Sequence, residues 1–143
     1  MKRFIRSVAV LGSGVMGSRL ACHFANAGFK VLLLDIVPQN LSEEERKDPA
    51  KRNSLVNKAL QQAIKSSPAP LYNQNFEHRI TTGNFEDDMP SIRDYDWVLE
   101  AVVENIKIKH QVFEQVEKYR KEGAFVTTNT SGIPIEMLIE GRS

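Results

Sequence analysis

The sequence has little cysteine, little excess charge and no long apolar run. Cys22 is the only cysteine among 143 residues, so no internal disulfide can form and an oxidising compartment is not implied. Nineteen basic and 18 acidic residues leave a formal net charge of +1, which gives no reason to expect nucleic acid or an anionic membrane as partner. No stretch approaches the roughly 20 apolar residues that span a bilayer, and the apolar start is too short for a signal peptide. We expect a cytoplasmic protein with no metal site.

The residues that are present predict one globular domain in which strands and helices alternate. Hydrophobic residues make up 41% of the chain and charged residues 26%, a balance typical of folded domains. Short apolar runs predict strands at Ser7–Leu11, Val31–Leu34, Arg79–Thr82, Asp96–Val103 and Ala124–Thr128. Helical spacing predicts helices at Val15–Ala27, Lys51–Lys65, Ile106–Lys121 and Ile135–Ile139. The order predicts an α/β fold with a doubly wound, mostly parallel sheet of the Rossmann type and a helical insertion after the second strand.

The same spacing predicts which residues face the core. On Val15–Ala27 the expected inward face consists of Met16, Leu20, Phe24 and Ala27. On Lys51–Lys65 it consists of Leu55, Ala59 and Ala63, with Leu60 and Ile64 beside them. The charged run Glu43–Asp48 is expected to be a solvated helix face or arm, and Cys22 is expected in or near the core.

A glycine-rich turn follows the first predicted strand and opens the first predicted helix. It reads Gly12, Ser13, Gly14, Val15, Met16, Gly17, which matches the dinucleotide-binding fingerprint in its expected context. The first glycine permits a tight turn, the second lets the backbone approach a pyrophosphate, and the third lets the helix pack closely on the sheet. The helix N-terminus then offers free N–H groups to the phosphates. The alternative is a merely structural glycine turn.

Asp35 predicts which dinucleotide binds. It lies 18 residues after Gly17 at the end of the second strand, where a carboxylate accepts hydrogen bonds from the adenosine ribose hydroxyls. Ile36 and Val37 supply no cation for a 2′-phosphate. Two like charges about 4 Å apart repel by about 4 kcal/mol at an effective dielectric of 20, so we expect NAD rather than NADP. The alternative for Asp35 is a turn-forming residue after a strand.

Two strings in the second half carry a family resemblance. They run from Glu100 to Lys109, including Glu-Ala-Val-Val-Glu-Asn, and from Thr128 to Ile135, including Asn-Thr-Ser. Together with the glycine turn and Asp35, they resemble the L-3-hydroxyacyl-CoA dehydrogenase family from about Val8 to Ile135. The resemblance implies a role in cofactor or substrate binding for each matching position. Glu104 and Lys109 lie near the nicotinamide ribose, Ala101 offers backbone beside the cofactor, Asn129 and Thr130 lie near the nicotinamide, and the catalytic Ser131 hydrogen-bonds the substrate's 3-oxygen.

The resemblance also implies a reaction and a longer protein. The family oxidises the 3-hydroxyl of an acyl-CoA thioester to a ketone in fatty-acid β-oxidation, with NAD as hydride acceptor. Its general base is a histidine oriented by a glutamate, and by the family pattern both fall after Ser143. We therefore expect residues 1–143 to be the NAD-binding domain alone, without the C-terminal helical domain for substrate binding and dimerisation. Such a piece is expected to bind NAD(H) with little or no activity, and to expose an apolar surface where that domain docks. The complete protein is expected to be a homo-oligomer.

Several alternatives stay open at this point. Glu104 and Lys109 are also suited to the first turns of a helix, and Ser131 is also suited to capping one. The three histidines, His23, His78 and His110, match no catalytic position of the family. The complete protein is alternatively another β-hydroxyacid dehydrogenase or a non-catalytic NAD-binding module.

Overall fold

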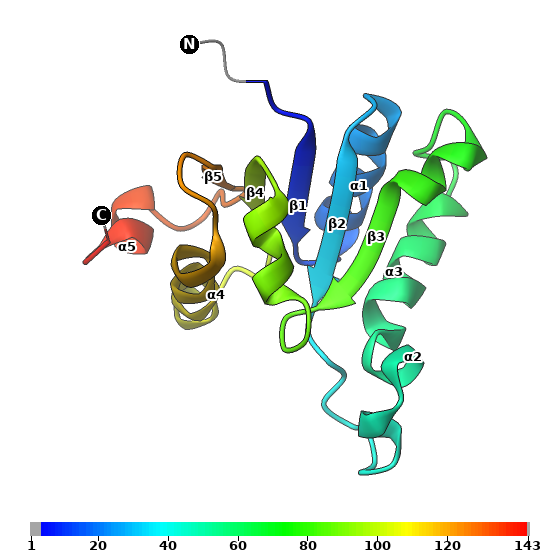
Figure 1. Cartoon of the computed structure of the whole chain (residues 1–143), viewed down its shortest axis with the longest axis horizontal. Helices are drawn as coiled ribbons and strands as arrows, with labels where there is room; N and C mark the ends of the chain where they lie inside the picture. The colour runs from blue at the N-terminus through cyan, green and yellow to red at the C-terminus, as the bar shows by residue number, and fades with distance from the viewer. Residues whose placement is uncertain (1–3, 143) are drawn as a thin grey trace.

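A five-stranded parallel sheet forms the centre of the computed structural model, which describes residues 4–142 (Figure 1). The strands are β1 (Ser7–Leu11), β2 (Lys30–Asp35), β3 (Ile80–Asn84), β4 (Trp97–Glu100) and β5 (Phe125–Thr128). Their order is β3-β2-β1-β4-β5, and every neighbouring pair is parallel. The chain thus runs outward from β1 to β3 and then returns to the other side of β1. This confirms the predicted α/β fold with a doubly wound, Rossmann-type sheet.

Helices cover both faces of the sheet. One face packs against α1 (Val15–Asn26) and α3 (Ser54–Ile64), and the other against α4 (Ile106–Tyr119) and the short 3-10 helix η3 (Met89–Asp94). Because successive strand residues point to opposite faces, alternate residues of β1 enter the two separate cores. The last helix, α5 (Ile135–Ile139), packs against α4 at the side of the molecule beyond β5 (Figure 1).

The helical insertion after β2 is confirmed, but its start differs from the prediction. It consists of η1 (Glu45–Lys47), α2 (Pro49–Arg52) and α3, followed by η2 (Gln74–Arg79) before β3. The helix predicted to run without interruption from Lys51 is broken at Asn53. The side chain of Asp48 caps α2 through the Ala50 amide at 2.9 Å, and Asn84 donates to the Asn53 side chain at 2.8 Å. The charged run before α2 is mostly exposed, as expected.

The buried faces of α1 and α3 also differ from the prediction. Met16 is 55% exposed, while Gly17, Ala21 and Ala25 are buried against the sheet together with Phe24. The small residues permit a close approach of α1 to β1, which turns Met16 outward. On α3 Leu60 is buried, at the side of the predicted face, together with Val56, which was not predicted. Leu55, Ala59 and Ala63 are only half-buried.

Cys22 lies in the core as predicted, and β4 is shorter than predicted. Cys22 is fully buried, and this burial raises the pKa of its thiol to about 11, so it remains a protonated core residue. The strand predicted to reach Val103 ends at Glu100, and Val103 is 64% exposed. The chain leaves the sheet there because it turns toward α4.

Asp96 holds the opposite, amino end of β4. Its Oδ2 accepts from the Arg6 amide at 2.8 Å and from the Ser7 amide at 3.2 Å. Its Oδ1 accepts from Lys121, and this hydrogen bond is the main reason that the pKa of the carboxyl falls to about 2. Asp96 thus ties the starts of β1 and β4 to the chain after α4.

Within residues 4–142, the helices lack the length and apolarity that a membrane crossing requires.

The structure predicts that alanine destabilises the protein at Gly17 but has little effect at Gly14 of the same turn. An added Cβ at Gly17 falls 1.8 Å from the carbonyl oxygen of Gly12, whereas a Cβ at Gly14 meets no atom within 4 Å. We expect Gly17→Ala to lower the free energy of unfolding by about 2–3 kcal/mol, as overpacked sites do. Gly14→Ala is the control and stays within about 1 kcal/mol of the parent protein. Urea denaturation measures both; equal stability of the two variants contradicts the close approach described here.

Candidate functional site

The residues that follow β1, β4 and β5 meet at one edge of the sheet. Each of these turns begins with a backbone hydrogen bond to the neighbouring strand: Gly12 N–H to the Leu34 carbonyl at 2.7 Å, Ala101 N–H to Leu11 at 2.7 Å, and Asn129 N–H to Glu100 at 2.8 Å. These bonds bring the glycine turn and the two strings of the family resemblance side by side. The carboxyl edge of a doubly wound sheet, where the strand order reverses, is where ligands bind.

Two glycines bring α1 directly onto the end of β1. Gly12 has φ of 108°, and a Cβ there meets the carbonyl oxygen of Ala101 at 2.5 Å. Gly17 is in contact with the carbonyl of Gly12, whose oxygen lies 1.8 Å from the position of an added Cβ. The first and third glycines therefore act as predicted. Ala101 packs behind the turn, so its backbone lies beside the proposed phosphate site.

The first turn of α1 faces open space. Gly14 is the N-cap, and among the described residues no side chain caps this helix. The first amides of a helix have no intrahelical acceptor and carry the positive end of its dipole. A hollow of about 350 Å³ opens beside the turn, with Ser13, Gly14 and Val15 on one side and residues of α3 on another. Exposed Met16 lies on the same turn. The site fits an anion such as the pyrophosphate of a dinucleotide.

Asp35 ties the end of β2 to the glycine turn. Its Oδ2 accepts from the Ser13 amide at 2.8 Å and from the Ser13 hydroxyl at 2.5 Å, and its Oδ1 accepts from the Ile36 amide at 2.7 Å. The link to Ser13 has no sequence signal beyond the motif itself. The carboxylate is half-buried and keeps a free lone pair on Oδ1. Its bond to a ribose stays a prediction.

Glu100 is a residue of this edge that the sequence prediction missed. The side chains of Glu100 and Lys109 are both completely buried. The Lys109 ammonium donates to Oε1 at 2.8 Å and to Oε2 at 2.9 Å. Oε1 also accepts from the Thr128 hydroxyl at 2.6 Å, and Oε2 from the Val102 amide at 2.7 Å. A signal was present: Glu100 is an acidic residue at the end of an apolar strand, a position where a buried carboxylate requires a partner.

Glu104 connects this ion pair to the turn that carries Ser131. Its Oε1 lies 3.2 Å from the Lys109 ammonium, and its Oε2 accepts from the Thr130 hydroxyl at 2.7 Å. The Thr130 hydrogen bond is the largest cause that lowers the pKa of Glu104; Lys109 and the Gly132 amide lower it further, against a partial loss of hydration. Glu104 is thus an ionised carboxylate that is still 44% exposed. Two neighbours of the exposed Ser131 touch it.

The structural alternatives for these residues have different outcomes: Lys109 does lie in the first turns of α4, whereas Ser131 caps no helix among the described residues. Glu104 precedes α4, and the N-cap of this helix is Asn105. The Asn105 side chain accepts hydrogen bonds from the Lys107 amide at 3.0 Å and the Ile108 amide at 3.2 Å. Ser131 does not cap α5, because that helix begins at Ile135 with Pro134 as N-cap. Lys109 points inward from α4 and is fully buried, with its ammonium 3.2 Å from Glu104.

The direct contacts with a cofactor and substrate stay predictions. They concern Lys109, Glu104 and Asn129 with the cofactor, and Ser131 with the substrate. Asn129 is exposed at the same edge. Because Lys109 is fully buried, it reaches that edge in this conformation through Glu104.

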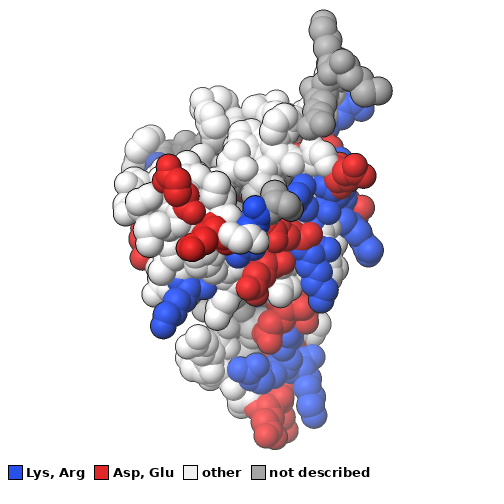
Figure 2. Space-filling model, turned by 90° about the vertical axis from the view of Figure 1, so that its left-hand side faces the viewer, with Lys and Arg blue, Asp and Glu red and all other residues white. Residues whose placement is uncertain are grey.

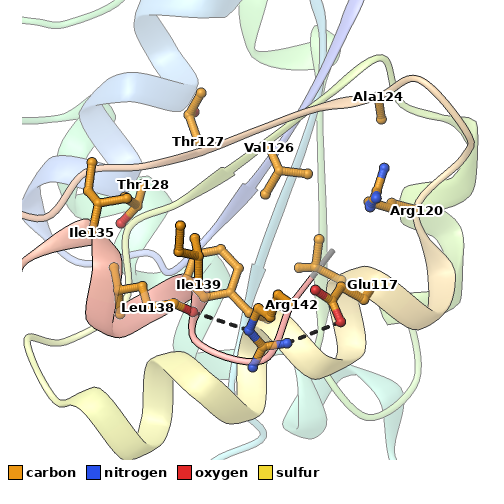
Figure 3. A pocket seen from close by; sticks show the side chains of 12 residues that line it. Glu117, Arg120, Ala124, Val126, Thr127, Thr128, Ile135, Leu138, Ile139 and Arg142 are labelled. Carbon is orange, nitrogen blue, oxygen red and sulfur yellow. Dashed lines mark hydrogen bonds and ion pairs between the residues drawn. The ribbon is translucent and has the colours of Figure 1, made fainter.

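A cavity larger than the hollow beside the glycine turn lies elsewhere, between α4, β5 and α5 (Figure 3). It has a volume of about 650 Å³ and an apolar wall that includes Val126, Leu138 and Ile139. Arg142 closes one side, with ion pairing to Glu117 at 3.2 Å and a hydrogen bond to the Leu138 carbonyl at 3.2 Å.

The surface around this cavity is apolar. Figure 2 views this side and shows an uncharged area over its upper part, with positive and negative side chains intermixed below it. The exposed large apolar residues of β5 and α5 are Phe125, Val126, Ile135, Met137 and Ile139. The expected apolar surface is therefore present. What covers it stays a prediction.

The contact between Thr130 and Glu104 makes a testable prediction. Because the Thr130 hydroxyl stabilises the charged carboxylate, Thr130→Val raises the pKa of Glu104 from its depressed value toward its ordinary value of 4.5. Carboxyl-carbon NMR titration measures the midpoint. Thr127→Val is the matched control, because the Thr127 hydroxyl instead accepts from the Trp97 indole at 2.8 Å. An unchanged Glu104 midpoint in the Thr130 variant contradicts the effect of the Thr130 hydroxyl on the pKa of Glu104.

Sequence comparison gives consistent matches across the chain. The family model described as "3-hydroxyacyl-CoA dehydrogenase, NAD binding domain" matches residues 7–143. A probable 3-hydroxyacyl-CoA dehydrogenase of Bacillus subtilis is 46% identical over 149 residues, covering 100% of this chain and 19% of that protein. One of Deinococcus radiodurans is 43% identical, covering 97% of this chain and 38% of that protein. A putative fatty acid oxidation complex trifunctional enzyme of Rickettsia felis is 41% identical, and the match covers 98% of this chain and 18% of that protein. The chain thus spans less than half the length of these relatives.

Solved structures agree with the sequence matches. The crystal structure of (S)-3-hydroxybutyryl-CoA dehydrogenase from Ralstonia eutropha superposes with a TM-score of 0.67 at 26% identity, covering 98% of this chain and 46% of that one. FadB2 of M. tuberculosis gives a TM-score of 0.69 at 25% identity, covering 99% and 46%. The predicted family and, through it, the predicted cofactor NAD are confirmed. The chain belongs to the family of NAD-binding domains of 3-hydroxyacyl-CoA dehydrogenases.

Proposed function

We propose that these residues form the cofactor half of an enzyme that oxidises L-3-hydroxyacyl-CoA to 3-oxoacyl-CoA with NAD in fatty-acid β-oxidation. The observation that carries the proposal is the convergence at one sheet edge of an uncapped helix N-terminus, the carboxylate of Asp35 and the Ser131 turn held by Glu104. The names of the Bacillus and Rickettsia relatives support the reaction and the pathway.

Each element at this edge has a distinct part in cofactor binding. The amides at the start of α1 bind the pyrophosphate, because they combine free donors with the positive end of the helix dipole. Asp35 accepts from the adenosine ribose hydroxyls, and Glu104 from those of the nicotinamide ribose. When bound, NAD supplies the hydride acceptor of the reaction.

Ser131 faces the substrate. Its side chain is exposed, and the turn around it is fixed on both sides by Glu104. Its hydroxyl donates to the substrate's 3-oxygen and orients the carbon that loses hydride. The proton of the 3-hydroxyl goes to a histidine that lies outside this sequence. The complete protein adds a helical domain that closes the substrate site against the apolar surface of β5 and α5, and it is a cytoplasmic homo-oligomer.

Asp35 determines the choice between NAD and NADP. A 2′-phosphate beside this carboxylate is repelled by about 4 kcal/mol at 4 Å and an effective dielectric of 20, which is on the order of a thousandfold in affinity. We expect NADH to bind far more tightly than NADPH, and Asp35→Asn to remove most of the difference. Isothermal titration calorimetry of both ligands measures it. Equal affinities of the unaltered chain for the two ligands contradict the role of Asp35.

The 143-residue chain is expected to bind NADH without catalysing the reaction. It holds no group in the predicted role of the general base, and general acid–base catalysis alone contributes about 10²–10⁴-fold. The measurement is the rate of NADH formation from 3-hydroxybutyryl-CoA and NAD, with calorimetric NADH binding as the control for a competent site. Turnover at an ordinary enzyme rate shows that the base lies within these residues.

A further inference from the structure

A completely buried ion pair lies directly beneath the candidate site. The Glu100 carboxylate accepts four hydrogen bonds from three parts of the chain: two from Lys109 of α4, one from the Thr128 side chain of β5, and one from the Val102 amide after β4. All of them are between 2.6 and 2.9 Å. Glu100 therefore joins the ends of β4 and β5 to the start of α4.

The pair continues toward the surface through Glu104. Besides Glu100, the Lys109 ammonium contacts the Glu104 Oε1 at 3.2 Å. The other oxygen of Glu104 accepts from Thr130 at 2.7 Å. One line of contacts thus runs from Glu100 through Lys109 and Glu104 to the turn that carries Ser131. It starts at complete burial and ends at a carboxylate that is 44% exposed.

Glu100 determines where the Lys109 ammonium lies. An ammonium without water requires a counter-charge and acceptors for its protons. Without Glu100, the only carboxylate left in contact with the Lys109 ammonium among the described residues is that of Glu104, which is partly in water. The ammonium is then drawn outward to Glu104. With Glu100 in place, Lys109 stays inward and meets Glu104 from below. The orientation of the exposed carboxylate is thus set by a buried one that no ligand reaches.

We propose that Glu100 is a positioning residue, which acts through Lys109 to fix the carboxylate of Glu104 and, through it, the turn that carries Ser131. Glu104, on the cofactor side of the edge, and Ser131, on the substrate side, then both depend on the buried Glu100. The part of this inference that concerns NADH rests on the proposed function of Glu104.

Two variants at opposite ends of β4 test the proposal. Glu100→Gln keeps the shape of the side chain but removes its charge and places an amide donor among donors. Asp96→Asn is the matched control, because Asp96 is also a carboxylate held by a lysine and by backbone amides, but at the far end of the same strand. Both variants are examined below their melting temperatures, so that only folded protein is compared.

The measurements separate positioning from stability. We expect Glu100→Gln to weaken NADH binding by about tenfold or more, as loss of supporting partners does for metal ligands, and to shift the Gly132 amide signal in ¹⁵N NMR spectra without cofactor. Asp96→Asn is expected to lower the melting temperature with NADH affinity and the Gly132 signal unchanged. If Glu100→Gln does not fold, Thr128→Val replaces it, since it removes one hydrogen bond of Glu100 without changing charge, and it is expected to change both readouts in the same direction.

Failure of the positioning role of Glu100 and failure of the proposed NADH-binding function give different results. If the unaltered chain binds NADH and the folded Glu100 or Thr128 variant retains that affinity and the Gly132 signal, the positioning role is overturned. If the unaltered chain does not bind NADH, the proposed function fails, and the Gly132 signal alone decides the positioning role. Equal losses of affinity in the Glu100 and Asp96 variants also overturn it, because they indicate a general effect of stability.

Discussion

The contact between Gly17 and the carbonyl of Gly12 is the constraint on which the rest of the site depends. It places the first turn of α1 directly at the end of β1, where the amides of that turn face open space. Gly12 in turn leaves room for the Ala101 carbonyl, so the end of β4 comes to the same place. The phosphate site and Glu104 lie at the same edge because no side chain of Gly12 separates its backbone from that of Ala101.

The second constraint is electrostatic. Removing two charges from water costs several kcal/mol per ion, and a buried pair recovers this only with good geometry and satisfied hydrogen bonds. The Glu100–Lys109 pair has both, so it offsets the cost of its own burial. It requires β4, β5 and α4 to meet in one arrangement. Glu104 after β4, and the turn after β5 that carries Ser131, take their positions from that arrangement.

Most of the fold could be predicted from the sequence, because β1, β2 and β4 are largely buried and read as short apolar runs. The start of β1 and the end of β5 were predicted to the residue, while β4 ended earlier, since a turn toward α4 leaves no apolar signal. At the break, Asn53 accepts a hydrogen bond from Asn84 of a distant strand, a contact that helical spacing does not reveal. Likewise, the exposure of Met16 follows from the closeness of α1 to the sheet rather than from helical spacing.

Apart from Glu100, the residues of the candidate site could be located in the sequence, but the contacts between them could not. The glycine turn, Asp35, Glu104 and Ser131 have recognisable positions in the sequence. The pairing of Glu100 with Lys109 crosses from a strand to a helix, and neither helical nor strand periodicity connects residues at that separation. The hydrogen bonds from Ser13 to Asp35 likewise depend on how the turn folds over the end of β2.

The central claim is that the bare amides at the start of α1, together with Asp35, hold a dinucleotide at the edge where β1 and β4 end. A crystal structure of the chain with NADH tests this most directly. The account predicts the pyrophosphate against the amides of residues 14–16 and the adenosine ribose on the Asp35 carboxylate. A dinucleotide bound in the cavity between α4 and α5 instead, with the glycine turn filled by side chains, contradicts it.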